Sequence, residues 1–487
     1  MKIKRLLAVV IITLLSLNSV TFAYGDNEGD GKTKKSGTGE TPATEVKSAN
    51  ETNLSAEEKL LLLTEKVRKL EEIIEQQQQI LESMQSKPTT DAANVAVTTV
   101  PATAPKTQVA PDEQIKKVDA LYKAYGQLNI SGDLRFRYDG QFDQGFDSPV
   151  DVPDRNRLRV RARVQFAGHF QDHFDWAIRL ASGRFTVPTA TNQDVSDFFN
   201  RKPIGFDRYF IRYNSKTEPY GVILQAGKFD YPWKRTMLTF DDNMQPEGAA
   251  ETVYYKGKGL LQEAKLVAFQ LPFNEASAGK DSVLYGGQLQ SVLGRGSWVL
   301  TNSITLLNFN QADTIARSVN KPTTQIGGGF EFGTTNRVRR DANGNVVGFV
   351  TNYNILDVIG EVGFKGFQKF PIVLTLNYAR NLSNRLDRLK ERNAYWAEIK
   401  VGRLKEKGDM EFGYIFARTE QDAVLSVFNY IDFLGTNSRN NRVAFGYTLN
   451  NNVYVQFFGI FNERFNTLPK SESRVQKRFQ FDVNYRF

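Results

Sequence analysis

The chain ends in Arg478-Phe-Gln-Phe-Asp-Val-Asn-Tyr-Arg-Phe487, a stretch that alternates polar and apolar residues without a break. Successive side chains of a β-strand point to opposite faces, so this stretch predicts a strand with one aromatic, apolar face and one polar face. Two kinds of protein use such a strand. In a soluble β-sheet the apolar face packs into the core, whereas in a closed membrane barrel it faces lipid and the polar face lines a wet interior.

The composition favours the membrane barrel. Of the 487 residues, 40% are hydrophobic and 24% are charged, and the mean hydropathy is −0.42, which is too polar for a bundle of membrane helices. A barrel tolerates this composition because half of each strand faces water. The 35 Phe and 19 Tyr residues suit aromatic girdles at the two membrane interfaces.

Several classes of function are disfavoured. The absence of cysteine excludes disulfides, thiolate catalysis and iron–sulfur clusters. His169 and His173 flank a predicted tight turn, so we expect no metal site and no other cofactor. No Gly-x-Ser-x-Gly motif occurs, so we do not expect an enzyme such as a lipase. The net charge of +9 comes from arginines on the polar faces of predicted strands, and we therefore expect no nucleic-acid partner.

Residues 1–23 have the features of a secretory signal peptide. Lys2, Lys4 and Arg5 form a basic start, residues 6–17 form an apolar run, and Ala23 lies at a suitable cleavage site. The apolar run is shorter than the about 20 residues that cross a bilayer as a helix. We therefore expect an exported protein that crosses a membrane only with strands. Residues 24–53 lack periodicity and are predicted to be disordered.

Residues 54–86 predict an oligomerising coiled coil. Apolar residues recur at spacings of three and four and fill successive a and d positions, with a polar Gln at one of them to fix the register. The predicted core comprises Leu60, Leu63, Val67, Leu70, Ile74, Gln77, Leu81 and Met84. A single amphipathic helix packed on a soluble core is the alternative. Residues 87–124 then form a Pro/Thr/Ala-rich linker that ends in a short helix.

From residue 125 to residue 487 the sequence predicts strands and turns, which we interpret as an all-β transmembrane barrel. Seven short connections are predicted, near residues 168–173, 215–220, 257–261, 293–296, 365–369, 404–408 and 449–452. Longer polar connections alternate with them, as is typical of outer-membrane barrels. Seven hairpins plus the first and last strands give sixteen antiparallel strands. Residues 325–332 and 346–350 look like a further hairpin, which we assign to an external loop; eighteen strands is the alternative.

Four segments resemble Gram-negative outer-membrane porins, specifically the Putative porin family. They are Asn129-Ile-Ser-Gly-Asp-Leu-Arg-Phe-Arg-Tyr138, the arginine-bearing second strand, residues 227–248 and the final strand. The resemblance spans residues 123–487. It implies a water-filled barrel in outer-membrane lipid for small hydrophilic solutes and ions, and a homotrimer. The even strand count leaves both termini in the periplasm, where we therefore expect the coiled coil. The last strand resembles the signal read by the barrel assembly machinery, carried here by Phe479, Phe481, Val483, Tyr485 and Phe487.

The polar faces of the first, second and last strands merge into one wall when the barrel closes. This basic wall carries Arg135, Arg137, Arg157, Arg159, Arg161, Arg163, Arg478 and Arg486. In general porins the third external loop folds inward, and the third long connection here, residues 230–248, carries Asp241, Asp242 and Glu247. We expect these acids to face the wall across a constriction, where a transverse field favours polar solutes.

Three functions are compatible with these features. The first is a general diffusion porin with a modest preference for anions. The second is an anion-selective porin, for example for phosphate, because arginine stays charged and can bind oxyanions with two donors. The third is a barrel that anchors a periplasmic coiled-coil tether.

Overall fold

The computed structural model describes residues 128–143, 153–170, 172–195, 198–275, 280–318, 334–383, 391–466 and 475–487. All of them belong to one compact unit, Lys106–Phe487. The predicted signal peptide, disordered segment, coiled coil and linker lie outside the described residues. No helix within these ranges has the length and apolar character needed to cross a membrane.

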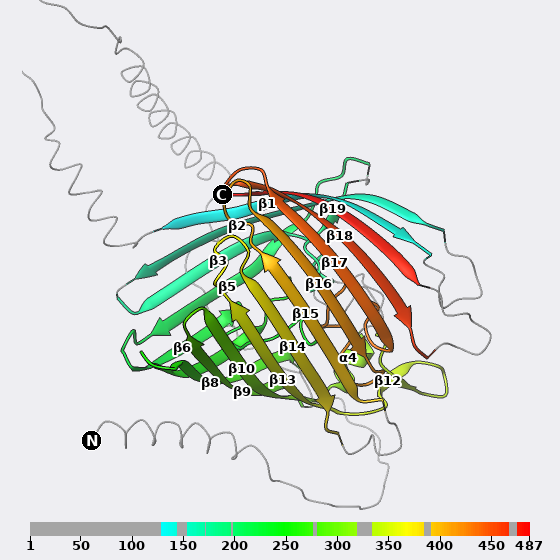
Figure 1. Ribbon diagram of the computed structural model, residues 1–487. Coiled ribbons are helices and arrows are strands. Elements are labelled where there is room, and N and C mark those ends of the chain that lie inside the picture. The colour runs from blue at the N-terminus through cyan, green and yellow to red at the C-terminus, as the bar shows by residue number, and fades with distance from the viewer. Residues whose placement is uncertain are drawn as a thin grey trace, which may run out of the picture. The chain divides into compact units, whose positions relative to one another are not determined.

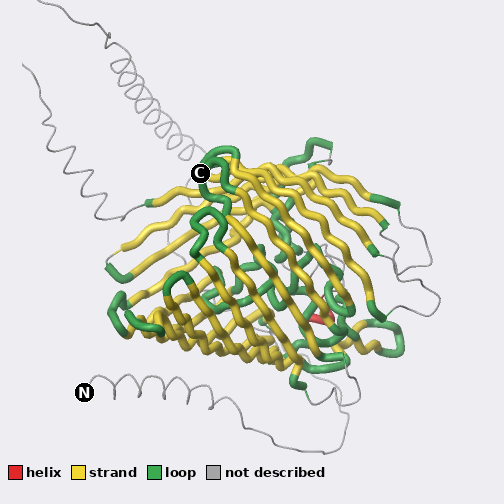
Figure 2. The backbone as a smooth tube through the Cα atoms, in the orientation of Figure 1, coloured by secondary structure: helices red, strands yellow, loops and turns green. Residues whose placement is uncertain are grey.

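Sixteen long antiparallel strands of the described chain close into a barrel (Figures 1 and 2). Consecutive long strands pair in hairpins, and β1 pairs with both β2 and β19, which closes the sheet. The strands are β1 (Asn129–Phe142), β2 (Arg155–Phe170), β3 (Phe174–Ser182), β5 (Ile204–Asn214), β6 (Tyr220–Lys228), β7 (Glu247–Lys256), β8 (Leu261–Asn274), β9 (Ser282–Arg295), β10 (Trp298–Asn310), β13 (Tyr353–Phe364), β14 (Ile372–Asn381), β15 (Asn393–Gly402), β16 (Met410–Thr419), β17 (Ser438–Thr448), β18 (Val453–Arg464) and β19 (Gln476–Arg486).

The predicted count of sixteen and the alternation of short and long connections are confirmed. The two-residue strand β4 (Gln193–Asp194) adds only a short bridge to β2. The suspected extra hairpin is β11 (Val338–Arg340) with β12 (Val346–Phe349), which pair with each other in a separate two-stranded sheet. Eighteen strands is therefore wrong. Residues 325–332 lie outside the described residues, and β11 takes the place expected for that arm.

The exposure of the side chains distinguishes a membrane barrel from a soluble one. On β1, Phe136 is 60% exposed and its neighbour Arg137 is 7% exposed. On β10, Leu306 is 57% exposed and Thr305 is 1% exposed. A soluble sheet would bury the apolar member of each pair and expose the polar one. Apolar side chains outside and polar side chains inside are the arrangement that lipid requires.

Three long connections fold into the barrel interior. The backbone of residues 229–246, 311–318, 334–352 and 420–437 runs inside the ring of strands (Figure 2). These residues contribute buried apolar side chains, which pack in one cluster with inward-facing strand residues such as Phe269 and Trp396. The middle connection includes the short helix α4 (Asp313–Ser318) as well as β11 and β12. Part of the lumen is therefore filled by a packed apolar core rather than by water.

The last residue of the chain completes the closing seam. The backbone N–H of Phe487 donates to the carbonyl of Gly132 at 3.1 Å, and that of Gly132 donates to the carbonyl of Phe487 at 2.9 Å. A Cβ on Gly132 would lie 2.6 Å from the Phe487 ring and 2.3 Å from the carbonyl oxygen of Arg163. Glycine therefore leaves the space into which the terminal ring packs.

Candidate functional site

The eight arginines of the basic wall lie on the inner faces of β1, β2 and β19. The register of β1 and β2 sets Arg135 opposite Arg161 and Arg137 opposite Arg159. The closing pair of β1 and β19 places Asp482 beside Arg137. Closure of the barrel thus brings together residues that are more than 340 positions apart in the chain.

The wall contains its own carboxylates. Asp133, Asp139 and Asp482 share the inner face with the arginines, because residues two apart on a strand point to the same side. Asp194 joins them from β4. The ion pairs are Asp133 with Arg161 (2.6 Å) and Arg163 (2.6 Å), Asp139 with Arg157 (2.5 Å) and Arg478 (2.7 Å), Asp482 with Arg137 (2.6 Å), and Asp194 with Arg159 (2.9 Å). The alternation of inward and outward residues along the strands would have been enough to identify Asp133, Asp139 and Asp482.

A further acid reaches the wall from an unexpected connection. Asp432, in the connection between β16 and β17, lies 2.9 Å from Arg478 and 3.6 Å from Arg137. Gln480 donates to the same carboxylate at 3.2 Å. Burial raises the pKa of the Asp432 carboxyl, but Arg478 and Arg137 lower that pKa by more, so it lies well below its usual range. The acid that meets the wall is therefore a carboxylate of residues 420–437.

The predicted constriction acids occupy three different environments. Asp241 is completely buried and Glu247 lies on the outward face of β7, where it contacts Tyr209 and Lys228. Neither can face the basic wall across an open passage, so that prediction is wrong for both. Asp242 is 66% exposed and pairs with Arg235 of its own connection at 2.8 Å.

Asp241 instead joins two of the inward connections. Its carboxylate accepts hydrogen bonds from the backbone N–H groups of Asn243 (2.7 Å) and Ile431 (3.1 Å). Its own N–H donates to the carbonyl of Phe428 at 2.7 Å. Burial raises the pKa of the Asp241 carboxyl to about 7, although these two amide donors favour the ionised form.

Residues 229–246 reach into the lumen and contact strands beyond the hairpin that they follow. The Lys234 N–H donates to the side chain of Gln288 on β9 at 2.7 Å, and its ammonium lies 2.5 Å from Glu361 on β13. The Thr236 hydroxyl donates to Asn377 on β14 at 2.5 Å. These partners lie on the inner faces of β9, β13 and β14, in the run of neighbouring strands β9-β10-β13-β14, so the connection lies inside the barrel.

Comparison with known proteins identifies the family. The family model described as Putative porin matches residues 151–293 and 330–487, more than half of the chain. The chain belongs to the Putative porin family. It is an outer-membrane channel protein, as the sequence resemblance implied.

Several solved porin structures are similar to this porin. OprB of Pseudomonas putida is 11% identical, with 77% of this chain and 97% of that chain covered and a TM-score of 0.47. A mutant porin of Rhodopseudomonas blastica is 12% identical, with 74% and 100% covered and a TM-score of 0.39. No curated protein sequence matches.

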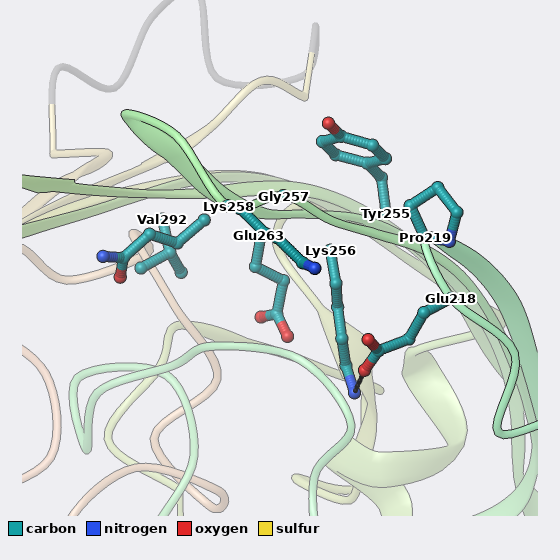
Figure 3. A pocket seen from close by; sticks show the side chains of 9 residues that line it. Glu218, Pro219, Tyr255, Lys256, Gly257, Lys258, Glu263 and Val292 are labelled. Carbon is teal, nitrogen blue, oxygen red and sulfur yellow. Dashed lines mark hydrogen bonds and ion pairs between the residues drawn. The ribbon is translucent and has the colours of Figure 1, made fainter.

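A cavity of about 750 Å³ opens near the short-turn ends of β6, β7 and β8 of the porin (Figure 3). The Lys256 ammonium lies 3.3 Å from the Glu218 carboxylate, and Glu263, which also lines the cavity, pairs with Lys265 at 2.8 Å. The cavity contains none of the wall arginines, and these charges are paired. We assign it no role in conduction.

Proposed function

We propose that this porin forms a water-filled channel for passive diffusion of small hydrophilic solutes, with a modest preference for anions. The excess of arginine over carboxylate along the basic wall carries this proposal. Seven of the eight arginines contact five carboxylates, those of Asp133, Asp139, Asp194, Asp432 and Asp482, whereas Arg486 donates to backbone carbonyls. Because arginine stays charged even when partly buried, the wall keeps a net positive charge that raises the local concentration of anions.

The uncompensated charge belongs mainly to Arg486 and Arg135. The guanidinium of Arg486 donates to three backbone carbonyls of the short turns, at 2.7 to 3.0 Å. The nearest carboxylate oxygen to Arg135, that of Asp482, is 3.7 Å away and also serves Arg137 at 2.7 Å. These two arginines support an anion preference that depends on salt concentration.

We infer that residues 229–246 and 420–437 together form the constriction. Their backbone contacts through Asp241 support this inference, as does the contact of Asp432 with the wall. The transverse field then runs between the arginines and the loop carboxylates Asp432 and Asp242. Solutes that can orient dipoles or charges in this field are favoured over apolar solutes.

The partners proposed for the barrel follow from its outward face. We propose that the porin sits in outer-membrane lipid as a homotrimer and is inserted by the barrel assembly machinery. The outward face of the last strand supports recognition by that machinery, since Phe481, Tyr485 and Phe487 are all exposed. The coiled coil would extend into the periplasm, where it could also act as a tether.

Planar-bilayer recordings test the wall. In a salt gradient, Arg159→Glu/Arg161→Glu should shift the reversal potential toward cation preference, and Asp432→Asn should shift it the other way. The matched control is Arg418→Glu/Arg439→Glu, which makes the same charge change at opposed positions on the outward face of β16 and β17. An unchanged reversal potential in the Arg159/Arg161 variant would remove the wall from the conduction path.

A further inference from the structure

A second set of cations lines a pocket of about 350 Å³ between the inner face of β5 and the connection at residues 229–246. None of its cations belongs to the basic wall. We propose that this pocket is a binding step for small oxyanions, carboxylates or phosphates, with Arg208 and Arg235 as the two anchoring groups. The proposal rests on the channel function above and extends it by naming a solute class.

Arg208 is held mainly by neutral groups. Its guanidinium donates to the amide oxygens of Gln245 at 3.0 Å and Gln165 at 3.4 Å, and its buried Nε has no hydrogen-bond partner. The nearest carboxylate, Asp230, is 3.9 Å away and lies closer to Arg212, at 3.1 Å. Amides orient a guanidinium without cancelling its charge, so Arg208 can still accept an anionic partner.

Arg235 is fixed in place, and its carboxylate partner is exposed. Its guanidinium stacks 3.9 Å from the centre of the Tyr231 ring and donates to the carbonyl of Phe240 at 2.7 Å. Asp242 pairs with it at 2.8 Å, but the Asp242 side chain is 66% exposed. Water solvates the Asp242 carboxylate and weakens the pair, although the Arg235 side chain itself is only 13% exposed. A solute oxyanion can therefore replace Asp242 at modest cost.

The floor of the pocket is rigid. Trp233 stacks on Phe269 of β8 with ring centroids 3.9 Å apart, and the Phe269 ring lies against Gly286 of β9, where a Cβ would be only 2.0 Å from it. This stack fixes the segment that carries Lys234 and Arg235. A preorganised site loses less conformational entropy when a ligand binds.

The donor set favours oxyanions over halides. A guanidinium presents parallel N–H groups whose spacing matches two oxygens of a carboxylate or phosphate, whereas chloride cannot use this fork. The pocket sets two arginines, Arg208 and Arg235, against two carboxylates that are each at least half exposed, and the Lys234 ammonium that also lines it is paired with Glu361. Chloride should move through the channel without binding in the pocket, whereas oxyanions should bind there transiently.

Single-channel recordings of the purified full-length porin in potassium chloride test this site. Succinate and inorganic phosphate are added in separate arms, and the half-blocking concentration of the chloride current is measured. We expect partial block in the parent. Arg208→Gln and Arg235→Gln should each raise the half-blocking concentration about tenfold, the effect of losing one charge-assisted hydrogen bond. Asp242→Asn should lower it.

Arg157→Gln is the matched control, because it removes a wall arginine that pairs with Asp139 and does not line the pocket. It should reduce anion preference and leave the block unchanged. Block by succinate alone, by phosphate alone or by both identifies the oxyanion, provided that Arg208→Gln or Arg235→Gln weakens it. A parent that conducts with anion preference, yet shows no block or the same block in both variants, would overturn the pocket and leave the channel function standing.

Discussion

Arg137 and Asp482 are almost completely buried, and they form a two-pronged ion pair with distances of 2.6 and 2.7 Å across the seam between β1 and β19. Burying two charges is unfavourable unless each keeps good partners, and removing only one of them destabilises a protein by about 3–5 kcal/mol. The stability of the seam therefore depends on individual ion pairs such as this one. It also depends on the size of single side chains, since only a residue without a side chain at position 132 leaves room for the Phe487 ring.

Gly132→Leu should weaken barrel closure. The new side chain would overlap the Phe487 ring and a carbonyl of β2, and overpacking of this kind costs about 1–3 kcal/mol. We expect the barrel to unfold at a lower temperature in detergent, as measured by the shift in gel mobility on heating. Gly360→Leu on the outward face of β13 is the control, because its Cβ would meet only one atom, the side-chain oxygen of Asn302 at 3.8 Å. Equal melting of both variants would contradict the role assigned to the seam.

The inward connections are held to one another as well as to the barrel. The N–H of Tyr430 donates to the carbonyl of Met237 at 3.0 Å, and Asp241 accepts from Ile431 at 3.1 Å. Asn336 of the middle connection donates to the carbonyl of Val424 at 2.8 Å. Each connection thus satisfies polar groups that another connection would otherwise leave buried and unpaired. We expect the three connections to order together.

The junction at Asp241 should loosen as the pH rises. The pKa of its carboxyl is about 7 in the folded protein and near 3.8 when exposed, so folding favours the protonated form. The contribution of Asp241 to the stability of the junction is therefore greatest below about pH 4. It falls between pH 4 and 7, where the carboxyl is ionised in the opened junction but still protonated in the closed one, and it stays low above pH 7. Amide hydrogen exchange of residues 229–246 and 420–437, corrected for the intrinsic rate, should show faster opening at pH 7.5 than at pH 4.5.

Asp241→Asn should abolish most of this pH dependence, because an amide does not ionise. Asp341→Asn is the control, since Asp341 lies in the exposed turn between β11 and β12, away from the junction. A parent whose exchange at the junction does not change with pH would show that the Asp241 carboxyl is ionised throughout this range.

On one side of the whole barrel, the apolar outer surface contains polar side chains. Glu251 of β7 and Gln270 of β8 face outward and hydrogen-bond to each other at 3.2 Å. A carboxylate on the lipid-facing side of a barrel is unfavourable. Four of the neighbouring outward positions carry small side chains, those of Ala226, Ala249, Ala268 and Gly287, beside the larger Leu224 and Tyr285. We propose that a second copy of the chain, rather than acyl chains, covers this part of the surface in the trimer proposed above.

Ala268→Trp should therefore disrupt the proposed trimer. The indole would hold a neighbouring barrel away from the Glu251–Gln270 pair. Native mass spectrometry of the full chain in detergent should show a shift from trimer to smaller species. Ala397→Trp is the matched control, because Ala397 lies on the outward face of β15 between Leu376 and Phe416. If both variants remain trimeric, the interface lies elsewhere on the barrel or in residues 54–86.

Local periodicity was sufficient to predict the barrel. Alternation at a period of two depends only on the two faces of a strand, so strand positions, the count of sixteen and the arginines of the basic wall can be read from the chain. The partners Asp133, Asp139 and Asp482 were available from the same parity. The apolar run in residues 423–433 also indicated a buried connection, because a loop exposed to water is usually polar.

The tertiary structure alone decided what fills the lumen. Asp432 meets Arg478 and Asp241 meets Ile431 through contacts between connections far apart in the sequence, and no local pattern specifies which loop packs on which. The positions of Arg208 and Arg235 in one pocket depend on the same packing. A strand's alternation determines which side chains face inward, whereas the space that remains inside is set by how the long connections bury their apolar residues together.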